Sequence, residues 1–392
     1  MKIIYLFNSR LPTEKAYGIQ VAKMCEAFAD NGHEVKLLYP HRKNPTISQD
    51  IFSYYSIKNN FSLKEVKSTD FYFPGLLDKA AFIIKSYFSA KALTKEALKE
   101  NANIYYTRDE LVAYFLSKQN KNVIFECHRF SNKRKKFYSH FKKINLKIVV
   151  ISDGLKGDLI KFGIKDSNIQ IARDGVDLSN FNVPINAEER KEEQKRLREE
   201  FFTYHFDFYR RKKIAVYIGS LYSWKGANIL ISVAEYLKQL NDNYLVWVVG
   251  GTDKNIEMLE KGMHPNIVPF IYDNAVPHKE VVRMLIAADC AILTGKETDS
   301  LSAKYTSPLK MFEYMASGCP IVAQDLPSFR EVLNDGNSFL VRPGDAKAMA
   351  DKIDFVFRDE NEKIVQEKAV RAFEDVKNYT WQKRIEKIIN FA

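Results

Sequence analysis

The chain has 392 residues, of which 46% are hydrophobic and 28% charged. This composition is typical of a globular protein, it excludes disordered, fibrous and membrane-embedded classes, and the length predicts two domains. No run of 18 apolar residues predicts a transmembrane helix, and residues 1–7 do not resemble a signal peptide. The four cysteines are scattered and form no Cys-x-x-Cys motif, which favours a reducing, cytosolic location without disulfides or zinc.

The net charge of +11 is concentrated in the first half of the chain. Residues 1–184 contain 30 lysines and arginines against 18 acidic residues, a balance of +12, whereas residues 185–392 have a balance of −1. Charge asymmetry of this kind indicates partners rather than fold. We therefore expect the first half to meet something anionic, such as a phospholipid surface, a lipid phosphate or a nucleic acid.

The predicted elements alternate between strands and helices. Residues 3–7 form an apolar strand, residues 18–30 have apolar side chains at helical spacing, and residues 35–39 form the next strand. A strand–helix–strand unit of this length predicts parallel pairing. Further strands are predicted at 103–107, 123–127, 147–152, 214–219, 244–251, 268–272, 290–294 and 320–323.

The strands fall into two series, which a highly charged stretch separates. We therefore predict an α/β fold of two Rossmann-like domains with mostly parallel sheets, and the cleft between the domains is the default ligand site. The predicted divisions are an N-terminal domain at 1–184, a charged connector at 185–213, a C-terminal domain at 214–377 and a terminal helix at 378–392.

The most informative motif spans residues 307–318. Ser307 is a favoured N-cap residue and Pro308 a favoured first helical residue, while Gly318 provides the stop. A helix that starts after a strand and a loop directs its free N–H groups toward a cleft, where they bind phosphate. Glu313 on the second turn can accept hydrogen bonds from two sugar hydroxyls. The alternative is an ordinary capped helix with a solvated Glu313.

A second motif, residues 219–226, follows a predicted strand and precedes a predicted helix. Gly219 lets the backbone approach a ligand, and Lys225 offers a point charge for a phosphate. The chain has no Walker A loop and no G-x-G-x-x-G. The alternative is a simple turn lysine.

A third candidate lies at the end of the predicted strand 123–127. Glu126 and His128 are two residues apart and therefore share one face of the strand. Folds of this class place ligand contacts at the carboxyl ends of parallel strands. The alternative is a hydrogen-bonded structural histidine.

These motifs, in this order, resemble the retaining glycosyltransferases of the GT-B fold, specifically the family-4 group. The likeness extends over nearly the whole chain, and the form Ser-Pro-Leu-Lys-Met-Phe-Glu-Tyr-Met-Ala is similar to that of bacterial enzymes that build cell-surface polysaccharide such as lipopolysaccharide or capsule. The segments that carry it are residues 8–20, 31–35, 126–128, 151–155, 174–177, 219–226, 249–251, 307–323 and 379–381.

The resemblance implies a hexosyl-type transferase that moves a sugar from a nucleotide-diphosphate donor, UDP- or GDP-linked, to a cell-envelope glycan or lipid-linked acceptor. It assigns the acceptor to the N-terminal domain and the nucleotide sugar to the C-terminal domain, with the terminal helix packed back on the former. It implies that Glu313 holds the ribose hydroxyls, Lys225 contacts the diphosphate and His128 lines the sugar pocket. The other positions assigned to the nucleotide-sugar site are Gly18, Gly219, Ser220, Tyr272, Ser307, Pro308, Leu309 and Lys310.

Two positions depart from the family pattern. The family has a pair of glutamates separated by seven residues, but Tyr305 stands eight residues before Glu313. Where the family has an arginine shortly before its lysine, Ser220 is the nearest match. Lys225 and Lys310 are therefore the expected positive charges at the phosphates.

Glycosyl transfer requires stabilisation of the departing nucleotide diphosphate, which a fixed cation and a helix N-terminus can supply. No Asp-x-Asp motif is present, so we predict a site without metal and an enzyme without cofactor. Retention is implied by the resemblance, and same-face attack assisted by the leaving phosphate is the hypothesis. The alternatives are a nucleotide-sugar epimerase of the same fold and a non-catalytic protein that binds sugar or nucleic acid.

Residues 129–147 interleave basic and aromatic side chains. Phe137, Phe141 and Ile144 recur at helical spacing beside a cationic face, a pattern that suits the surface of an anionic membrane. The alternative is a helix whose apolar stripe packs on its own domain. Nucleic acid is not expected as a partner, because no known binding module accompanies the charge. We therefore predict a cytoplasmic protein in peripheral contact with the inner face of the plasma membrane.

Overall fold

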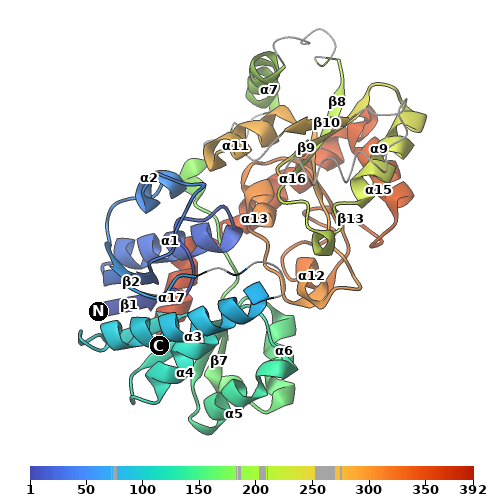
Figure 1. Ribbon diagram of the computed structural model, residues 1–392. Helices are drawn as coiled ribbons and strands as arrows, with labels where there is room; N and C mark the ends of the chain where they lie inside the picture. Colours follow the sequence, from blue (N-terminus) through green and yellow to red (C-terminus); the bar gives the residue numbers. More distant parts are fainter. Residues whose placement is uncertain are drawn as a thin grey trace. The chain divides into compact units, whose positions relative to one another are not determined.

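The computed structural model describes residues 1–71, 73, 77–181, 183, 187–202, 209, 211–251, 270–273 and 276–392. The chain divides into two compact units, the first formed by Met1–Asp174 with Trp381–Ala392 and the second by Gly175–Thr380. Each unit contains one sheet of parallel strands with helices packed on it (Figure 1). The predicted α/β fold of two Rossmann-like domains is confirmed.

The first unit has a seven-stranded sheet in the order β3-β2-β1-β4-β5-β6-β7. Helix α1 packs with the terminal helix α17, while α3, α4 and α5 pack side by side as a second layer (Figure 1). The strands are β1 (Lys2–Leu6), β2 (Glu34–Pro40), β3 (Ser62–Val66), β4 (Ile104–Thr107), β5 (Val123–Cys127), β6 (Lys147–Val150) and β7 (Ile169–Ile171). The helices are α1 (Ala16–Asp30), α2 (Ile51–Tyr55), α3 (Leu77–Ala97), α4 (Glu110–Ser117), α5 (Lys135–Lys143), α6 (Asp153–Phe162) and α17 (Trp381–Phe391).

The second unit has a six-stranded sheet in the order β10-β9-β8-β11-β12-β13. Its strands are β8 (Lys213–Ile218), β9 (Tyr244–Val249), β10 (Phe270–Asp273), β11 (Cys290–Leu293), β12 (Ile321–Gln324) and β13 (Phe339–Val341). Its helices are α7 (Ala187–Phe201), α9 (Ile229–Leu240), α11 (His278–Ala287), α12 (Ser300–Lys304), α13 (Leu309–Ala316), α14 (Pro327–Arg330), α15 (Ala346–Phe357) and α16 (Glu362–Val376).

Alternate residues of each strand point to opposite faces of the second sheet. Helices cover both of these faces, so the side chains on each face are buried. Ile214, Val216 and Ile218 of β8 belong to a core that includes α11 and α13. Ala215 and Tyr217 of the same strand belong to a core formed with α9 and α15. Burial on both faces explains why these strands are continuous apolar runs in the sequence.

The charged stretch predicted as a connector is part of the second unit. Arg198 of α7 is 7% exposed, and its guanidinium donates to the carbonyl oxygens of Ala287 (2.7 Å) and Lys212 (3.1 Å). It also pairs with Asp289 at 2.6 Å. The division between the units therefore falls at Asp174 instead of residue 184, because α7 is docked on the second core and does not cross free between domains.

Within the described ranges, no helix combines the length and the apolar character needed to cross a membrane.

Candidate functional site

The carboxyl end of β8 leads into a segment where backbone atoms lie very close together. Gly250, at φ +107°, follows β9, and a Cβ atom built there would lie 2.8 Å from the carbonyl oxygen of Gly219. The N–H group of Gly219, at φ +145°, donates to Val249 (2.8 Å). Both conformations favour glycine. Gly219, a predicted site residue, therefore lies where the backbones after β8 and β9 approach each other too closely to leave room for side chains.

Helix α13 is fixed to the same strand end by one tyrosine. The hydroxyl of Tyr314 accepts from the N–H group of Ile218 at 2.9 Å and donates to its carbonyl oxygen at 3.2 Å. The helix begins at Leu309 with Pro308 as its N-cap residue, so the prediction of Ser307 as N-cap and Pro308 as first helical residue is wrong by one position. The extended backbone of Pro308, at ψ 125°, excludes it from the helix. Ser307 is buried just before this start.

Two lysines lie in this region without an acidic partner among the described residues. Lys225 donates from Nζ to Ser220 Oγ at 2.7 Å. Lys310 Nζ lies 3.9 Å from the ring centroid of Tyr217, is closed to solvent and has no hydrogen-bond partner within the described part of the chain. A Cβ built on Gly219 would be 3.6 Å from the same Nζ. The structure thus brings together four of the predicted positions, Gly219, Ser220, Lys225 and Lys310.

Burial lowers the pKa of both lysines. The pKa of Lys225 is lowered to about 8 by desolvation. The pKa of Lys310 is well below its ordinary value, first because of desolvation and then because of repulsion by Lys225, with Glu313 opposing the change. Two desolvated amines without an ion-pair partner among the described residues are unfavourable in the free protein, and a ligand anion would relieve this cost.

Glu313 is held by a residue that the sequence reasoning missed. Its Oε1 lies 2.6 Å from Nε2 of His278, the first residue of α11, and the Glu313 side chain is 14% exposed. Glu313 is therefore not the solvated side chain of the alternative interpretation. The available signal for His278 was its position just after the β10 segment, because residues that follow parallel strands gather at one sheet edge. Tyr272 was also assigned to this site, but its side chain lies outside the described residues.

In the first unit, His128 directly follows β5 and contacts Glu126. The two atoms His128 Nε2 and Glu126 Oε1 are 2.5 Å apart, and Glu126 is fully buried. Burial alone would raise the pKa of Glu126, but the Arg384 guanidinium and the hydrogen bond from His128 hold it well below its ordinary value. Glu126 is therefore an ionised acceptor. His128 must donate from Nε2, which leaves Nδ1 as an acceptor.

The pKa of His128 is lowered to about 4, first by burial and then by the charge of Arg108, although Glu126 opposes this. The histidine is thus neutral at ordinary pH. Its Nδ1 lone pair can accept a hydrogen bond from a hydroxyl group of a ligand.

Glu126 is the centre of a buried polar network that spans the unit. Arg384 of α17, whose side chain is 1% exposed, donates to Glu126 Oε1 at 2.8 Å and lies 3.7 Å from Asp174. Gln20 of α1 donates to Glu126 Oε1 at 2.7 Å, and the Tyr106 hydroxyl also donates to this carboxylate. The terminal helix is thereby tied to the strand that positions His128. The sequence offered no signal for Arg384, because its partner is 258 positions away.

Gly18 lies in α1, where packing excludes a side chain. A Cβ at this position would be 2.0 Å from the Tyr55 hydroxyl and 2.6 Å from Thr13 Cγ2. The Tyr55 hydroxyl accepts from the N–H group of Thr13 at 2.7 Å and donates to its carbonyl oxygen at 2.9 Å. Close packing is therefore a sufficient local reason for this glycine, and its assigned role near a phosphate remains a prediction.

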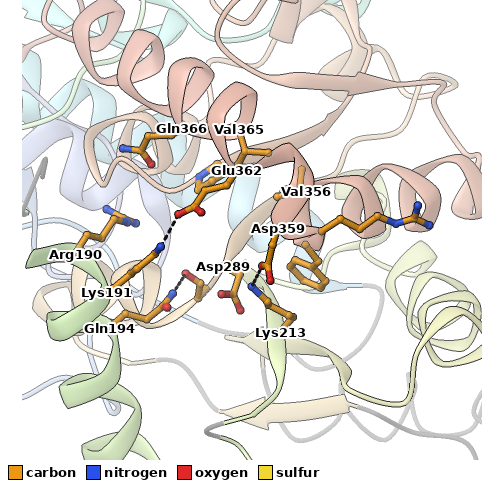
Figure 2. Close-up of a pocket in the computed structure, with 14 residues that line it drawn as sticks. Arg190, Lys191, Gln194, Lys213, Asp289, Val356, Asp359, Glu362, Val365 and Gln366 are labelled. Atoms are coloured by element: carbon orange, nitrogen blue, oxygen red, sulfur yellow. Dashed lines mark hydrogen bonds and ion pairs between the residues drawn. The ribbon is translucent and has the colours of Figure 1, made fainter. Parts of the chain in front are cut away.

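A pocket in the second unit lies away from these residues (Figure 2). It is lined by residues at or next to the amino ends of the strands, including Lys213 at the start of β8 and Asp289 just before β11. Ion pairs cross it, Lys191 with Glu362 at 2.6 Å and Lys213 with Asp359 at 3.4 Å (Figure 2). The first of these pairs joins α7 to α16 and the second joins the start of β8 to Asp359 just before α16, so both lysines are engaged in ion pairs.

Three comparisons relate the chain to known proteins. Residues 200–373 match the family described as "Glycosyl transferases group 1". An uncharacterized glycosyltransferase of Methanocaldococcus jannaschii is 25% identical over 65% of this chain and 62% of its own length. A phosphatidyl-myo-inositol mannosyltransferase of Mycobacterium leprae is 28% identical over 40% of each. The chain thus spans less than two thirds of either relative.

A solved structure of Anabaena HepE in complex with UDP-glucose superimposes with a TM-score of 0.70 at 14% identity, over 99% of this chain and 98% of that one. This likeness shows the fold. Together the matches show similarity to glycosyltransferases over part of the chain and a shared fold over its length.

We predict that Lys225→Met stabilises the ligand-free protein. The folded-state pKa of about 8 is below the unfolded value, so the charged lysine disfavours folding below about pH 8, and this penalty disappears as the pH rises toward 10.5. The gain should be on the order of 1–3 kcal/mol at pH 7 and vanish near pH 10.5. Urea unfolding of the variant at both pH values measures it. Lys347→Met on α15, where the side chain is 65% exposed, is the control and should change little. A clear loss of stability in Lys225→Met at pH 7 would contradict the prediction.

We also predict that Arg384→Met destabilises the protein by about 3–5 kcal/mol at pH 7, because Glu126 would remain buried without its cation. Acidification should reduce this loss, since Glu126 can then be protonated. The double variant Arg384→Met/Glu126→Gln should recover part of it. Urea unfolding of the three proteins at pH 7 and pH 5 tests this, and a loss below about 1 kcal/mol for the single variant would refute the assignment of the network.

Proposed function

We propose that the protein transfers a sugar from a nucleotide-diphosphate donor to an acceptor hydroxyl. The observation that carries the proposal is the pair of lysines without an acidic partner, Lys225 and Lys310, beside the start of α13. A diphosphate supplies the negative charge that this region lacks, and preorganised cations stabilise it most where water is excluded.

The reaction breaks the bond between the anomeric carbon and the diphosphate oxygen. The electron pair of that bond stays on the diphosphate, where Lys225, Lys310 and the first N–H groups of α13 would stabilise the new charge. The acceptor hydroxyl forms a new bond to the anomeric carbon, and its proton passes to the departing phosphate. Retention by same-face attack, in the manner of family 4, and independence of metal are part of the proposal, because the two lysines offer the cations that a metal would otherwise supply.

Glu313 is suited to hold the donor's ribose. Its Oε1 contacts His278, so its orientation is fixed while its second oxygen can accept from a hydroxyl. In the first unit, His128 is the proposed sugar contact, with Nδ1 as the acceptor. A site of this kind would reject a sugar that lacks the matching hydroxyl, because a buried acceptor would lose its partner.

We propose a UDP-linked hexose as the donor, since HepE, with the same fold, was solved with UDP-glucose. The proposed acceptor is a cell-envelope glycan or a lipid-linked sugar, as in polysaccharide biosynthesis, presented at the cytoplasmic face of a membrane. The named relative from Mycobacterium leprae, a phosphatidyl-myo-inositol mannosyltransferase, gives a precedent for an acceptor with a lipid anchor.

Calorimetry with UDP, GDP, UDP-glucose and GDP-mannose tests the donor half of the proposal. We expect one nucleotide to bind, and Lys225→Met to weaken that binding by about tenfold or more, because one charge-assisted contact is lost. Lys347→Met is the matched control, and its affinity should equal that of the wild type. If none of these nucleotides binds, the transferase proposal is refuted. Release of an epimerised nucleotide sugar without acceptor would instead indicate the epimerase.

Nucleotide binding should also depend on pH. The free Lys225 has a pKa of about 8, and an adjacent diphosphate would raise it, so binding must take up a proton once the pH exceeds about 8. We expect the affinity to fall as the pH rises above that value. Calorimetry in two buffers of different ionisation enthalpy measures the proton uptake, and Lys225→Met should show less of it. Proton release at pH 9 would contradict this assignment.

A further inference from the structure

Helix α3 exposes large apolar side chains on its outer side. Phe82, Ile83, Ile84, Tyr87 and Phe88, called here the apolar ridge, are between 39% and 67% exposed. Single exposed apolar residues are normal on protein surfaces, but five within seven positions form a contiguous patch, and such patches mark interaction sites.

The ridge is not needed for the core of its own unit. The buried side of α3 includes the small residues Ala81, Ala90 and Ala97, which let the helix lie close to the sheet. The largest side chains in the first half of the helix thus point outward, the reverse of an ordinary surface helix. Such an inversion is typical of a surface that meets a partner outside the unit.

The layer that contains the ridge also contains the strongest positive charge of the chain. From Lys118 to Lys147 there are ten lysines and arginines and one acidic residue, Glu126, which is buried. The exposed lysines of this stretch that have no ion pair within the described ranges include Lys133, Lys135, Lys136, Lys142 and Lys143.

Aromatic contacts join the ridge to this cationic stretch. The rings of Tyr87 on α3 and Phe115 on α4 are 5.6 Å apart, and those of Tyr114 on α4 and Phe137 on α5 are 5.4 Å apart. The three helices lie side by side (Figure 1). They therefore present one surface with an apolar part on α3 and a cationic part on α5, called here the α3–α5 face.

We propose that the α3–α5 face docks the protein on an anionic lipid bilayer, with the apolar ridge inserted at the interface and the α5 lysines against the headgroups. This deepens the proposed function, since it rests on an acceptor presented at a membrane. Apolar insertion beside cations is the chemistry that recognises anionic lipid surfaces. A second copy of the chain is disfavoured as the occupant, because it would bring the same unpaired cations to the interface.

The face differs from the one that the sequence pattern indicated. Tyr138 and Phe141 of α5 are fully buried, so much of the apolar side of that helix packs on its own unit, and only Ile144 just after it is 40% exposed. Helix α5 thus supplies charge, while the apolar contribution comes from α3.

Co-sedimentation of the full chain with vesicles tests the proposal, without nucleotide or acceptor. Vesicles of phosphatidylcholine alone and of phosphatidylcholine with phosphatidylserine are compared. We expect binding to the anionic vesicles. The ridge variant Phe82→Ser/Ile83→Ser/Phe88→Ser and the charge variant Lys133→Glu/Lys135→Glu/Lys136→Glu should each lose at least about tenfold in affinity for them.

The matched control is Lys363→Glu/Ile364→Ser on α16, which removes an exposed cation and an exposed apolar side chain from the second unit and should bind like the wild type. Thermal unfolding verifies that all variants are folded. Equal sedimentation of the ridge variant and the control would overturn the proposal, as would absence of wild-type binding. A wild-type dimer in solution that the ridge variant abolishes would also overturn it, because the ridge would then be a self-association surface.

Nucleotide calorimetry on the same proteins separates this proposal from the transferase assignment. Vesicle binding without nucleotide binding would refute the transferase and leave the docking face intact. Nucleotide binding without vesicle binding would refute the docking face alone.

Discussion

Parallel strand pairing is the constraint on which the candidate site depends. Because all strands of the second sheet run in one direction, the segments that follow β8, β10 and β11 emerge at the same edge. Lys225 follows β8, His278 follows β10 and Glu313 lies in the second helix after β11. Side chains from segments far apart in the sequence therefore meet without any local signal that they should.

Buried charge is compensated in the scaffold of both units, by Glu126 with Arg384 in the first unit and by Asp289 with Arg198 in the second, but not at the candidate site. In the first, Arg384 and Glu126 compensate each other, and Gln20 and Tyr106 complete the hydrogen bonds of the carboxylate. At the candidate site of the second unit, the Lys310 amine is closed to solvent and the Lys225 amine is partly desolvated, and neither has an acidic partner among the described residues. An uncompensated buried charge lowers the stability of the folded protein. A compensated ion pair therefore suits a scaffold, whereas lysines without an acidic partner are expected at a binding site, where a ligand supplies the opposite charge.

The sequence predicted the inner strands well and missed three of the four strands at the edges of the two described sheets. Strands β5 and β9 were predicted to within two residues, because burial on both faces makes them unbroken apolar runs. The missed strands β3, β7 and β13 are all at sheet edges and are only three to five residues long. Polar residues interrupt the apolar pattern of β3 and β7, and β13, although apolar, is only three residues long.

The same distinction holds at the candidate site. Gly219, Lys225, Lys310 and Glu313 were predicted because local motifs, a strand end and a helix start, surround them. Arg384 and His278 were not, because their significance depends on contacts 258 and 35 positions away. Pairing across such separations is decided by tertiary packing, which a single sequence does not encode in any window of a few residues.

The contrast between α3 and α5 shows why an amphipathic pattern alone does not identify a docking surface. In α5 the pattern includes Phe141, which is fully buried in its own unit, and Ile144 just after the helix, which is 40% exposed. In α3 the apolar residues occur on nearly all sides, so the pattern gives no direction, and only the burial of the small residues shows that the large ones point outward. An inverted helix of this kind would lower stability and solubility if nothing covered it. Its place beside unpaired cations, rather than its hydrophobicity, is what favours a lipid surface over another protein.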